Sequence, residues 1–215
     1  RIRLGSLEPR IITGSFAKAL AEIPEVCPHF HLSLQSGCDE TLRRMNRRYT
    51  SAEYLEKVKL LREVFAHPAI TTDIIVGFPQ ETEEEFQTTC AFARQAAFAQ
   101  IHVFKYSRRQ GTMADAMAGQ ILETVKGERS DVLLAVENEL EQEYQKLFLG
   151  CEEEVLLEEI TEIGDKKYLI GYNERYVRIA VDAGEYPDAM QRCNTIATVR
   201  VLGHLTEGIL LGEFR

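Results

Sequence analysis

The sequence has 215 residues, of which 45% are apolar and 27% are charged, and its formal net charge at pH 7 is −9. This composition is typical of globular proteins and excludes collagen-like, disordered and disulfide-stapled miniprotein classes. The longest apolar runs, such as residues 132–136, are far shorter than the roughly 20 residues that cross a bilayer, so we expect no membrane partner.

Basic residues are outnumbered, yet they form two local groups that could face an anion. These are Arg43, Arg44, Arg47 and Arg48, followed by Lys105, Arg108 and Arg109. The five cysteines are an odd number and are widely spaced, which predicts reduced thiols and a cytoplasmic location. Neither the cysteines nor the histidines have a familiar ligand spacing, so we predict no metal site and no general base.

Four β-like runs, at residues 2–6, 30–34, 71–77 and 101–106, alternate with helical patterns in the first part of the chain. Thr50 with Glu53, and Thr82 with Glu85, are capping boxes that predict two helix starts. This alternation predicts an α/β fold with parallel strands. Polar residues follow the strands, and in such folds the functional site lies at the carboxyl ends of the strands.

Residues 120–148 have the pattern of a long helix, which we expect to end before Gly150. Five short runs with a period of two then follow, which predicts a small antiparallel β-barrel of the OB-like size class. We therefore expect two domains, residues 1–149 and 150–215. The second carries seven basic and thirteen acidic residues, so only one face of it could contact nucleic acid.

Five segments, in this order and spacing, resemble the radical SAM methylthiotransferases. They are RIRLGSLEP (residues 1–9), HLSLQSG (31–37), MNRRYT (45–50), TDIIVGFP (72–79) and HVFKYS (102–107). The resemblance implies the distal part of a radical SAM (βα) barrel, followed by a TRAM domain that closes this family.

The segments around Glu8 and His102 most resemble the enzymes that add a methylthio group to N6-threonylcarbamoyladenosine beside the tRNA anticodon. This implies S-adenosylmethionine, two [4Fe-4S] clusters, a reducing electron donor and the tRNA anticodon stem-loop as a partner. The alternatives are isopentenyladenosine in tRNA, an aspartate of a ribosomal protein, or a non-catalytic RNA-binding module.

The sequence departs from the family because it has no C-x-x-x-C-x-x-C segment, whose thiolates bind the cluster. It also begins with Arg1, without an initiating Met or a signal peptide. We therefore expect the carboxyl-terminal part of a longer enzyme, starting near the third of six barrel strands and inactive alone.

The resemblance implies a set of contacts to S-adenosylmethionine. Arg47 could bind the cofactor carboxylate. The alternative for Glu8 is a solvated side chain, and the alternative for Gln35 and Ser36 is turn formation before Gly37. A buried strand without a ligand would look similar around Ile75, and an aromatic residue at position 104 is also common in a core. The implied cofactor residues are Glu8, Gln35, Ser36, Arg47, Asp73, Ile75, Gly77 and Phe104.

Gln80 stands where the family usually has a glycine, so the geometry of that turn is open. In the second domain, two tyrosines could stack on unpaired bases and two arginines could meet phosphates, although tyrosines in a small barrel often belong to its core. The implied RNA-binding residues are Tyr172, Asn173, Arg175, Tyr176 and Arg178.

Overall fold

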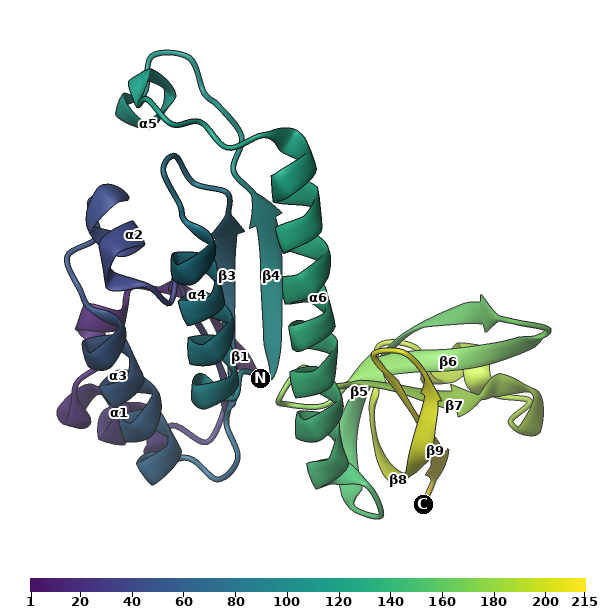
Figure 1. The fold of residues 1–215 in the computed structure, drawn as a ribbon. Helices are drawn as coiled ribbons and strands as arrows, with labels where there is room; N and C mark the ends of the chain where they lie inside the picture. The colour runs from purple at the N-terminus through teal and green to yellow at the C-terminus, as the bar shows by residue number, and fades with distance from the viewer. The chain divides into compact units, whose positions relative to one another are not determined.

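A computed structural model describes the whole chain, Arg1–Arg215, as two compact units (Figure 1). One comprises residues 2–140 and the other residues 141–215 together with Arg1. The division falls within the last long helix, whereas the boundary expected from the sequence, at residues 149 and 150, lies after that helix.

The first unit contains a four-stranded parallel sheet in the order β1-β2-β3-β4, which confirms the predicted α/β fold. The strands are β1 (Ile2–Leu7), β2 (Val26–Leu32), β3 (Ala69–Val76) and β4 (Gln100–Lys105). The helices are α1 (Gly14–Ala21), α2 (Asp39–Arg44), α3 (Ser51–Val64), α4 (Glu83–Ala96), α5 (Met113–Ala116) and α6 (Glu123–Gln145), with short 3-10 turns η1 (Pro9–Ile11) and η2 (Lys146–Phe148).

Both predicted capping boxes start helices. The Thr50 hydroxyl accepts the Glu53 N–H, and the Glu53 carboxylate accepts the Thr50 N–H at the start of α3. Thr82 and Glu85 make the same pair of bonds at the start of α4. These reciprocal bonds satisfy amide donors that a helix start leaves without partners.

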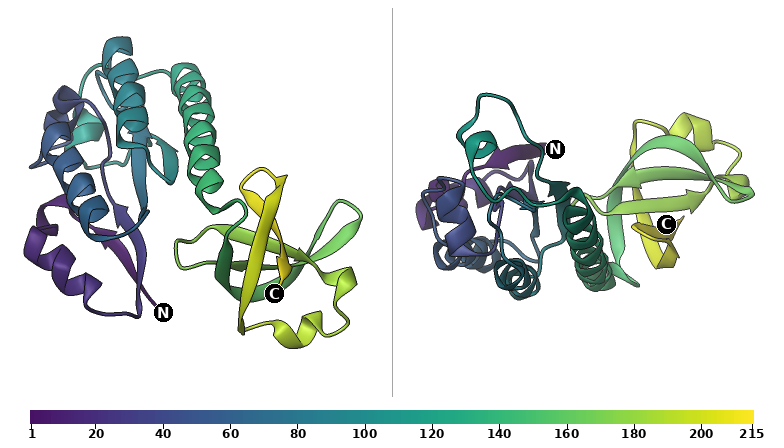
Figure 2. Two further views of the ribbon diagram at one scale, coloured as in Figure 1. Left: turned by 90° about the horizontal axis from the view of Figure 1, so that it is seen from below. Right: turned by 45° about the horizontal axis from the view of Figure 1, so that its top comes forward.

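The core of this unit lies on one face of the sheet. Ile70, Ile74 and Val76 of β3 are fully buried and pack with residues of α3, α4 and α6. Helices α1, α3 and α4 run along this face (Figures 1 and 2). Asp73 and Ile75 alternate with these core residues and are only partly buried, so they lie on the opposite face, which we call the open face.

The second unit is a closed barrel in the order β5-β6-β7-β9-β8. Its strands are β5 (Glu152–Ile163), β6 (Lys166–Tyr172), β7 (Arg178–Asp182), β8 (Ile196–Thr206) and β9 (Ile209–Phe214), with 3-10 turns η3 (Ala183–Glu185) and η4 (Ala189–Arg192). Its core includes Leu157, Leu169, Ile179, Val199 and Leu210.

The prediction of an antiparallel barrel is wrong for one strand pair, because β7 and β9 run parallel. The other four pairs are antiparallel. The reason is topological: an odd number of strands cannot alternate in direction all the way around a closed ring. One parallel pair is therefore required in this five-stranded barrel.

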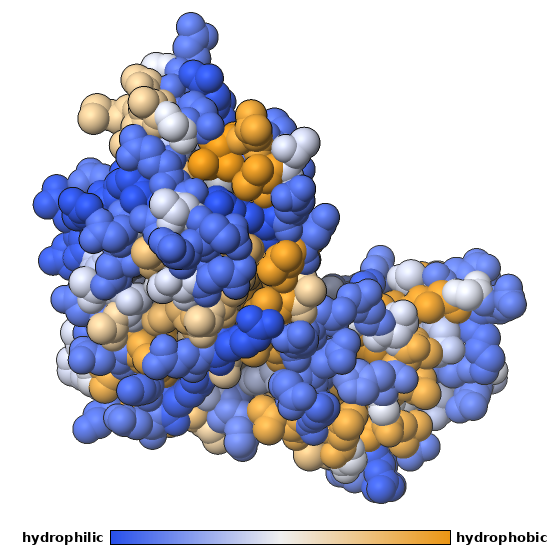
Figure 3. Space-filling model, in the orientation of Figure 1, coloured by the Kyte–Doolittle hydropathy of each residue, from blue (hydrophilic) through white to orange (hydrophobic).

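No helix in the structure combines the length and the apolar character needed to cross a membrane. The space-filling view shows apolar residues in several separate patches on a mainly hydrophilic surface (Figure 3). The most exposed large apolar side chains, Met113, Met190 and Leu122, come from different segments of the chain.

Candidate functional site

Glu8 and Arg47 lie near the same tyrosine at the carboxyl end of the sheet. Glu8 follows β1 and is exposed, and no side-chain hydrogen bond caps the turn that it starts. The Tyr49 hydroxyl lies 2.8 Å from the Ser33 carbonyl and 2.9 Å from the Leu34 carbonyl. Burial raises the pKa of Tyr49, while the Arg47 charge lowers it and the Glu8 charge raises it. Both charged groups are therefore close enough to act on this phenol.

Gln35 and Ser36 form the turn after β2. Gln35 has a φ of 73°, donates its N–H to the Asp73 carbonyl at 2.8 Å and accepts the Ile75 N–H at 2.9 Å. The Ser36 hydroxyl is buried, lies 3.1 Å from the Thr89 hydroxyl and accepts the Cys38 N–H. The turn-forming alternative thus has direct support for both residues.

Gly77, at the end of β3, is close to a lysine of α6. It has a φ of +73°, and a Cβ added there would lie 2.4 Å from Lys126 Cγ. The missing side chain thus admits Lys126, a different neighbour from the adenine expected from the resemblance. Lys126 is 2% exposed, and its ammonium group donates to the Tyr106 carbonyl at 2.9 Å and to Glu123 at 2.7 Å.

A buried ion pair holds the loop that follows β3. Glu81 accepts the Gly77 N–H at 2.7 Å and the Arg129 guanidinium at 2.7 Å, and the side chains of this pair are 1% and 7% exposed. Burial raises the pKa of Glu81, against the opposing effects of the Gly77 N–H and Arg129. Sequence reasoning missed Lys126 and Arg129, and the only signal was two cations spaced by three on an otherwise acidic helix.

The turn after β3 contains Gln80 at the position where the family usually has a glycine. Its φ is 67°, its N–H donates to the Gly119 carbonyl at 2.8 Å and its side-chain amide donates to the Ala118 carbonyl at 3.2 Å. A left-handed conformation costs a non-glycine residue about 1–3 kcal/mol. The two hydrogen bonds from Gln80 offset this cost.

On the open face, β3 and β4 place the remaining cofactor candidates side by side. Ile75 is the register partner of Phe104, and Asp73 is the partner of His102. The Phe104 side chain is 52% exposed and Ile75 is partly buried, so this pair offers an apolar surface to a flat ring. The Asp73 carboxylate lies 3.3 Å from His31 Nε2.

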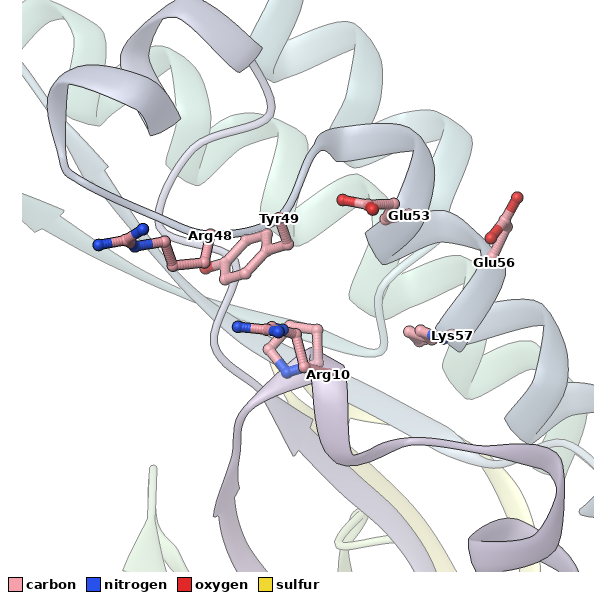
Figure 4. A pocket seen from close by; sticks show the side chains of 7 residues that line it. Arg10, Arg48, Tyr49, Glu53, Glu56 and Lys57 are labelled. Carbon is pink, nitrogen blue, oxygen red and sulfur yellow. The ribbon is translucent and has the colours of Figure 1, made fainter.

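A cavity of about 230 Å³ lies beside Tyr49 (Figure 4). Its lining includes Arg10, Arg48 and Lys57 as well as the acidic Glu53 and Glu56. The volume is below the range of about 300–1,000 Å³ that is usual for small-molecule pockets.

In the barrel unit, Tyr172 and Tyr176 stack on each other with ring centroids 4.3 Å apart and an angle of 16°. Tyr176 has a φ of 64° and is 43% exposed. Asn173 is fully buried: its Oδ1 accepts the N–H groups of Arg175 and Val177, and its Nδ2 donates to Glu153. Asn173 therefore shapes the turn that brings the two rings together.

The two arginines near this turn have protein neighbours. The Arg175 guanidinium lies 5.9 Å from the centre of the Phe148 ring. Arg178 lies 4.0 Å from Glu159 and is one-third exposed. The structure thus brings the five RNA-binding candidates to one strand–turn–strand segment between β6 and β7.

Comparison with known proteins identifies relatives. Residues 6–93 match the radical SAM superfamily. The chain is 39% identical over 178 residues to the threonylcarbamoyladenosine tRNA methylthiotransferase MtaB of Thermotoga maritima. The matched region covers 83% of this chain and 40% of that protein. It is 43% identical over 159 residues to the tRNA-2-methylthio-N(6)-dimethylallyladenosine synthase of Aquifex aeolicus. That matched region covers 74% of this chain and 36% of that protein. The chain belongs to the radical SAM methylthiotransferase family.

The first match is longer than residues 2–140, so the chain resembles this relative in part of the barrel unit as well. It spans about a third to two fifths of the length of the first relatives. Among solved structures, the radical SAM enzyme coproporphyrinogen III oxidase of Escherichia coli has a TM-score of 0.54 at 19% identity, over 63% of this chain and 31% of that one. This likeness supports the radical SAM fold.

The five cysteines of this chain do not fit a cluster site. Cys27, Cys38 and Cys90 are buried in separate segments of the chain, while Cys151 is exposed and Cys193 is partly exposed. No three of them share the spacing that binds an iron–sulfur cluster, so these five residues do not form a ligand set for one. The carboxylate of Glu8 and the apolar pair Ile75 and Phe104 do fit parts of S-adenosylmethionine, which has an amino group and an adenine ring.

Proposed function

We propose that this chain is part of an enzyme that transfers a methylthio group to N6-threonylcarbamoyladenosine beside the tRNA anticodon. The observation that carries this proposal is the 39% identity to MtaB of Thermotoga maritima over 83% of the chain. The MtaB of Bacillus subtilis adds a match over 86% of the chain at 36% identity. A tRNA substrate also agrees with a cytoplasmic location.

S-adenosylmethionine would supply the methyl group and, upon reductive cleavage, the radical. The complete enzyme would carry two [4Fe-4S] clusters and take electrons from a reducing donor. In this chain, Glu8 would accept hydrogen bonds from the cofactor's amino group, and Arg47 would bind its carboxylate. Ile75 and Phe104 would pack against the adenine.

We further propose that residues 150–215 form a TRAM-like, OB-like domain that binds the anticodon stem-loop. Tyr172 and Tyr176 already stack on each other, and a free face of such a pair can extend the stack with an unpaired base. Arg178 would meet the RNA backbone. Because this domain has a net charge of −6, stacking would contribute more to affinity than general charge attraction.

A binding assay tests this RNA surface. Replacing Tyr172 or Tyr176 with alanine is expected to weaken binding of the full chain to a fluorescent anticodon stem-loop by about 1–3 kcal/mol, the usual contribution of one stacked base. Leu202→Ala, at another exposed position of the same unit, is the control and should have no effect. Equal affinity for all variants would contradict the RNA surface.

A second candidate substrate is dimethylallyladenosine in tRNA. It rests on the synthases of Aquifex aeolicus and Alkaliphilus oremlandii, which are 43% and 44% identical to this chain. These identities exceed that of MtaB but extend over fewer residues of the chain.

The nucleosides of tRNA decide between the two substrates. Mass spectrometry of digested tRNA from cells that lack the gene should show loss of the 2-methylthio form of threonylcarbamoyladenosine. An intact copy of the gene should restore this nucleoside. A gene carrying Glu8→Gln should fail to restore it, whereas Glu56→Gln should succeed. Loss of only the dimethylallyl product supports the second candidate, and loss of neither overturns both.

A further inference from the structure

Three polar side chains from neighbouring strands meet on the open face of the sheet. They are His31 on β2, Asp73 on β3 and His102 on β4. One ligand atom from each, a ring nitrogen or a carboxylate oxygen, lies within 4.8 Å of the others. No spacing in the sequence reveals this group, because each member comes from a different strand.

The strand register explains the meeting. Asp73 and His102 are direct partners across β3 and β4, so their side chains stand next to each other on the same face. His31 pairs with Thr71, which precedes Asp73 by two residues and therefore shares that face. The His31 and His102 rings stack with centroids 5.7 Å apart, across β3.

The surroundings of His31 orient it for coordination. Its Nδ1 lies 3.1 Å from the Thr71 hydroxyl, and its Nε2 faces the Asp73 carboxylate at 3.3 Å. A histidine that binds a metal through one ring nitrogen usually donates a hydrogen bond from the other, which fixes the ring and its tautomer. Thr71 can accept that hydrogen bond.

Partial burial strengthens the case for a cation. The side chains of His31 and Asp73 are 13% and 27% exposed, whereas His102 is open to solvent. Charge interactions are less screened at such a half-buried position than in bulk water. The Asp73 carboxylate faces the imidazole ring of His31 on the neighbouring strand.

We propose that His31, Asp73 and His102 bind a divalent transition-metal ion of the Zn²⁺ or Fe²⁺ class. Two imidazoles and one carboxylate are a donor set for such ions, and three protein ligands leave positions open for water or another ligand. Mg²⁺ and Ca²⁺ fit poorly, because they prefer oxygen ligands. The site makes no use of cysteine and lies two residues along the strands from Ile75 and Phe104. It goes beyond the proposed methylthio transfer and assigns Asp73 to a metal in place of the cofactor.

Titration with Co²⁺ tests the proposal on the full chain. Cys151→Ser serves as the background, because the exposed thiol could bind the probe by itself. We expect one equivalent of Co²⁺ to produce visible ligand-field bands without a thiolate charge-transfer band. Zn²⁺ should displace Co²⁺ and raise Tm, because binding to the folded state stabilises it. Competition between Zn²⁺ and Fe²⁺ under anaerobic conditions then ranks the affinities of the site for these two ions.

Substitutions identify the ligands. Asp73→Asn and His102→Gln should abolish the Co²⁺ bands and the Zn²⁺-dependent rise in Tm, and Thr71→Val should weaken binding about 10–100-fold. Asp165→Asn and His67→Asn, at exposed positions, are matched controls that should leave binding unchanged.

The outcomes are separate from those of the proposed function, because neither RNA nor S-adenosylmethionine is present. His102 is exposed, so its replacement should leave the far-UV circular dichroism and the Tm without metal unchanged. Absence of Co²⁺ binding, or binding that survives both Asp73→Asn and His102→Gln, would overturn the metal site and would leave the methylthiotransferase proposal untouched.

Discussion

At the scale of single residues, Gly77 has two reasons to be glycine. Its φ is +73°, and a Cβ atom at this position would lie 2.4 Å from Lys126 Cγ. Local conformation and a distant neighbour therefore impose the same residue type, and neither reason needs a bound cofactor.

Gly77→Ala should lower the free energy of unfolding by about 1–3 kcal/mol, because alanine is strained at a positive φ. Urea denaturation measures the change. Gly127→Ala is the matched control: Gly127 lies inside α6 with open space around it, and alanine should stabilise the helix by about 1 kcal/mol. Equal effects of the two substitutions would contradict the assigned role of Gly77.

Glu81 and Arg129 form the most buried ion pair among the salt bridges of this chain. Glu81→Gln should destabilise the protein by about 3–5 kcal/mol, because it leaves the Arg129 charge buried without its counter-charge. Denaturant unfolding gives the value. Glu84→Gln, an exposed change in the same region, should stay within about 0.5 kcal/mol of the original protein. A similar small effect at both positions would show that the pair contributes little.

At the scale of elements, a partly buried salt bridge joins α2 to the start of α4. Arg44 donates to both carboxylate oxygens of Glu85, at 2.9 and 2.5 Å, and these bonds lower the pKa of Glu85. Glu85 also closes the capping box with Thr82. One carboxylate therefore fixes a helix start and a helix–helix contact.

The pH dependence of stability follows from this lowered pKa. Unfolded Glu85 takes up a proton near its ordinary pKa of 4.5, above the folded value, so the stabilisation is complete above that pH and is lost as pH falls through the folded pKa. Glu85→Gln should cost about 1.5–3 kcal/mol at neutral pH and flatten the loss of stability in acid.

Unfolding free energies measured across the acidic range test this expectation. Glu84→Gln is again the control, and its curve should run parallel to that of the original protein. Parallel curves for Glu85→Gln as well would show that Arg44 and Glu85 do not contribute to the acid sensitivity.

At the scale of the whole molecule, each of the two units has its own hydrophobic core. Ile74 belongs to the core of residues 2–140, and Ile179 belongs to the core of the barrel. Separate cores predict separate cooperative transitions.

Calorimetry of core variants tests this independence. Ile74→Ala and Ile179→Ala each remove a fully buried side chain and should cost about 2–5 kcal/mol. Each substitution should lower the melting temperature of one transition and leave the other in place. A single transition that both substitutions shift equally would mean that the two units unfold together.

The sequence by itself determined the features that depend on near neighbours. The capping boxes at Thr50 and Thr82 and the four parallel strands were all predicted, because helix capping and side-chain periodicity act over a few residues. The sequence motifs also gave the methylthiotransferase family, which the relatives confirm.

Only the tertiary structure decided what depends on residues far apart in the chain. Lys126 next to Gly77, the partnership of Glu81 with Arg129, and the parallel pairing of β7 with β9 follow from how elements pack and how a five-stranded ring closes. Likewise, His31 and His102 meet across β3 through strand register, although their spacing in the sequence predicts no site. Packing brings such groups together without leaving a local pattern, since the free energy that holds them comes from contacts between elements.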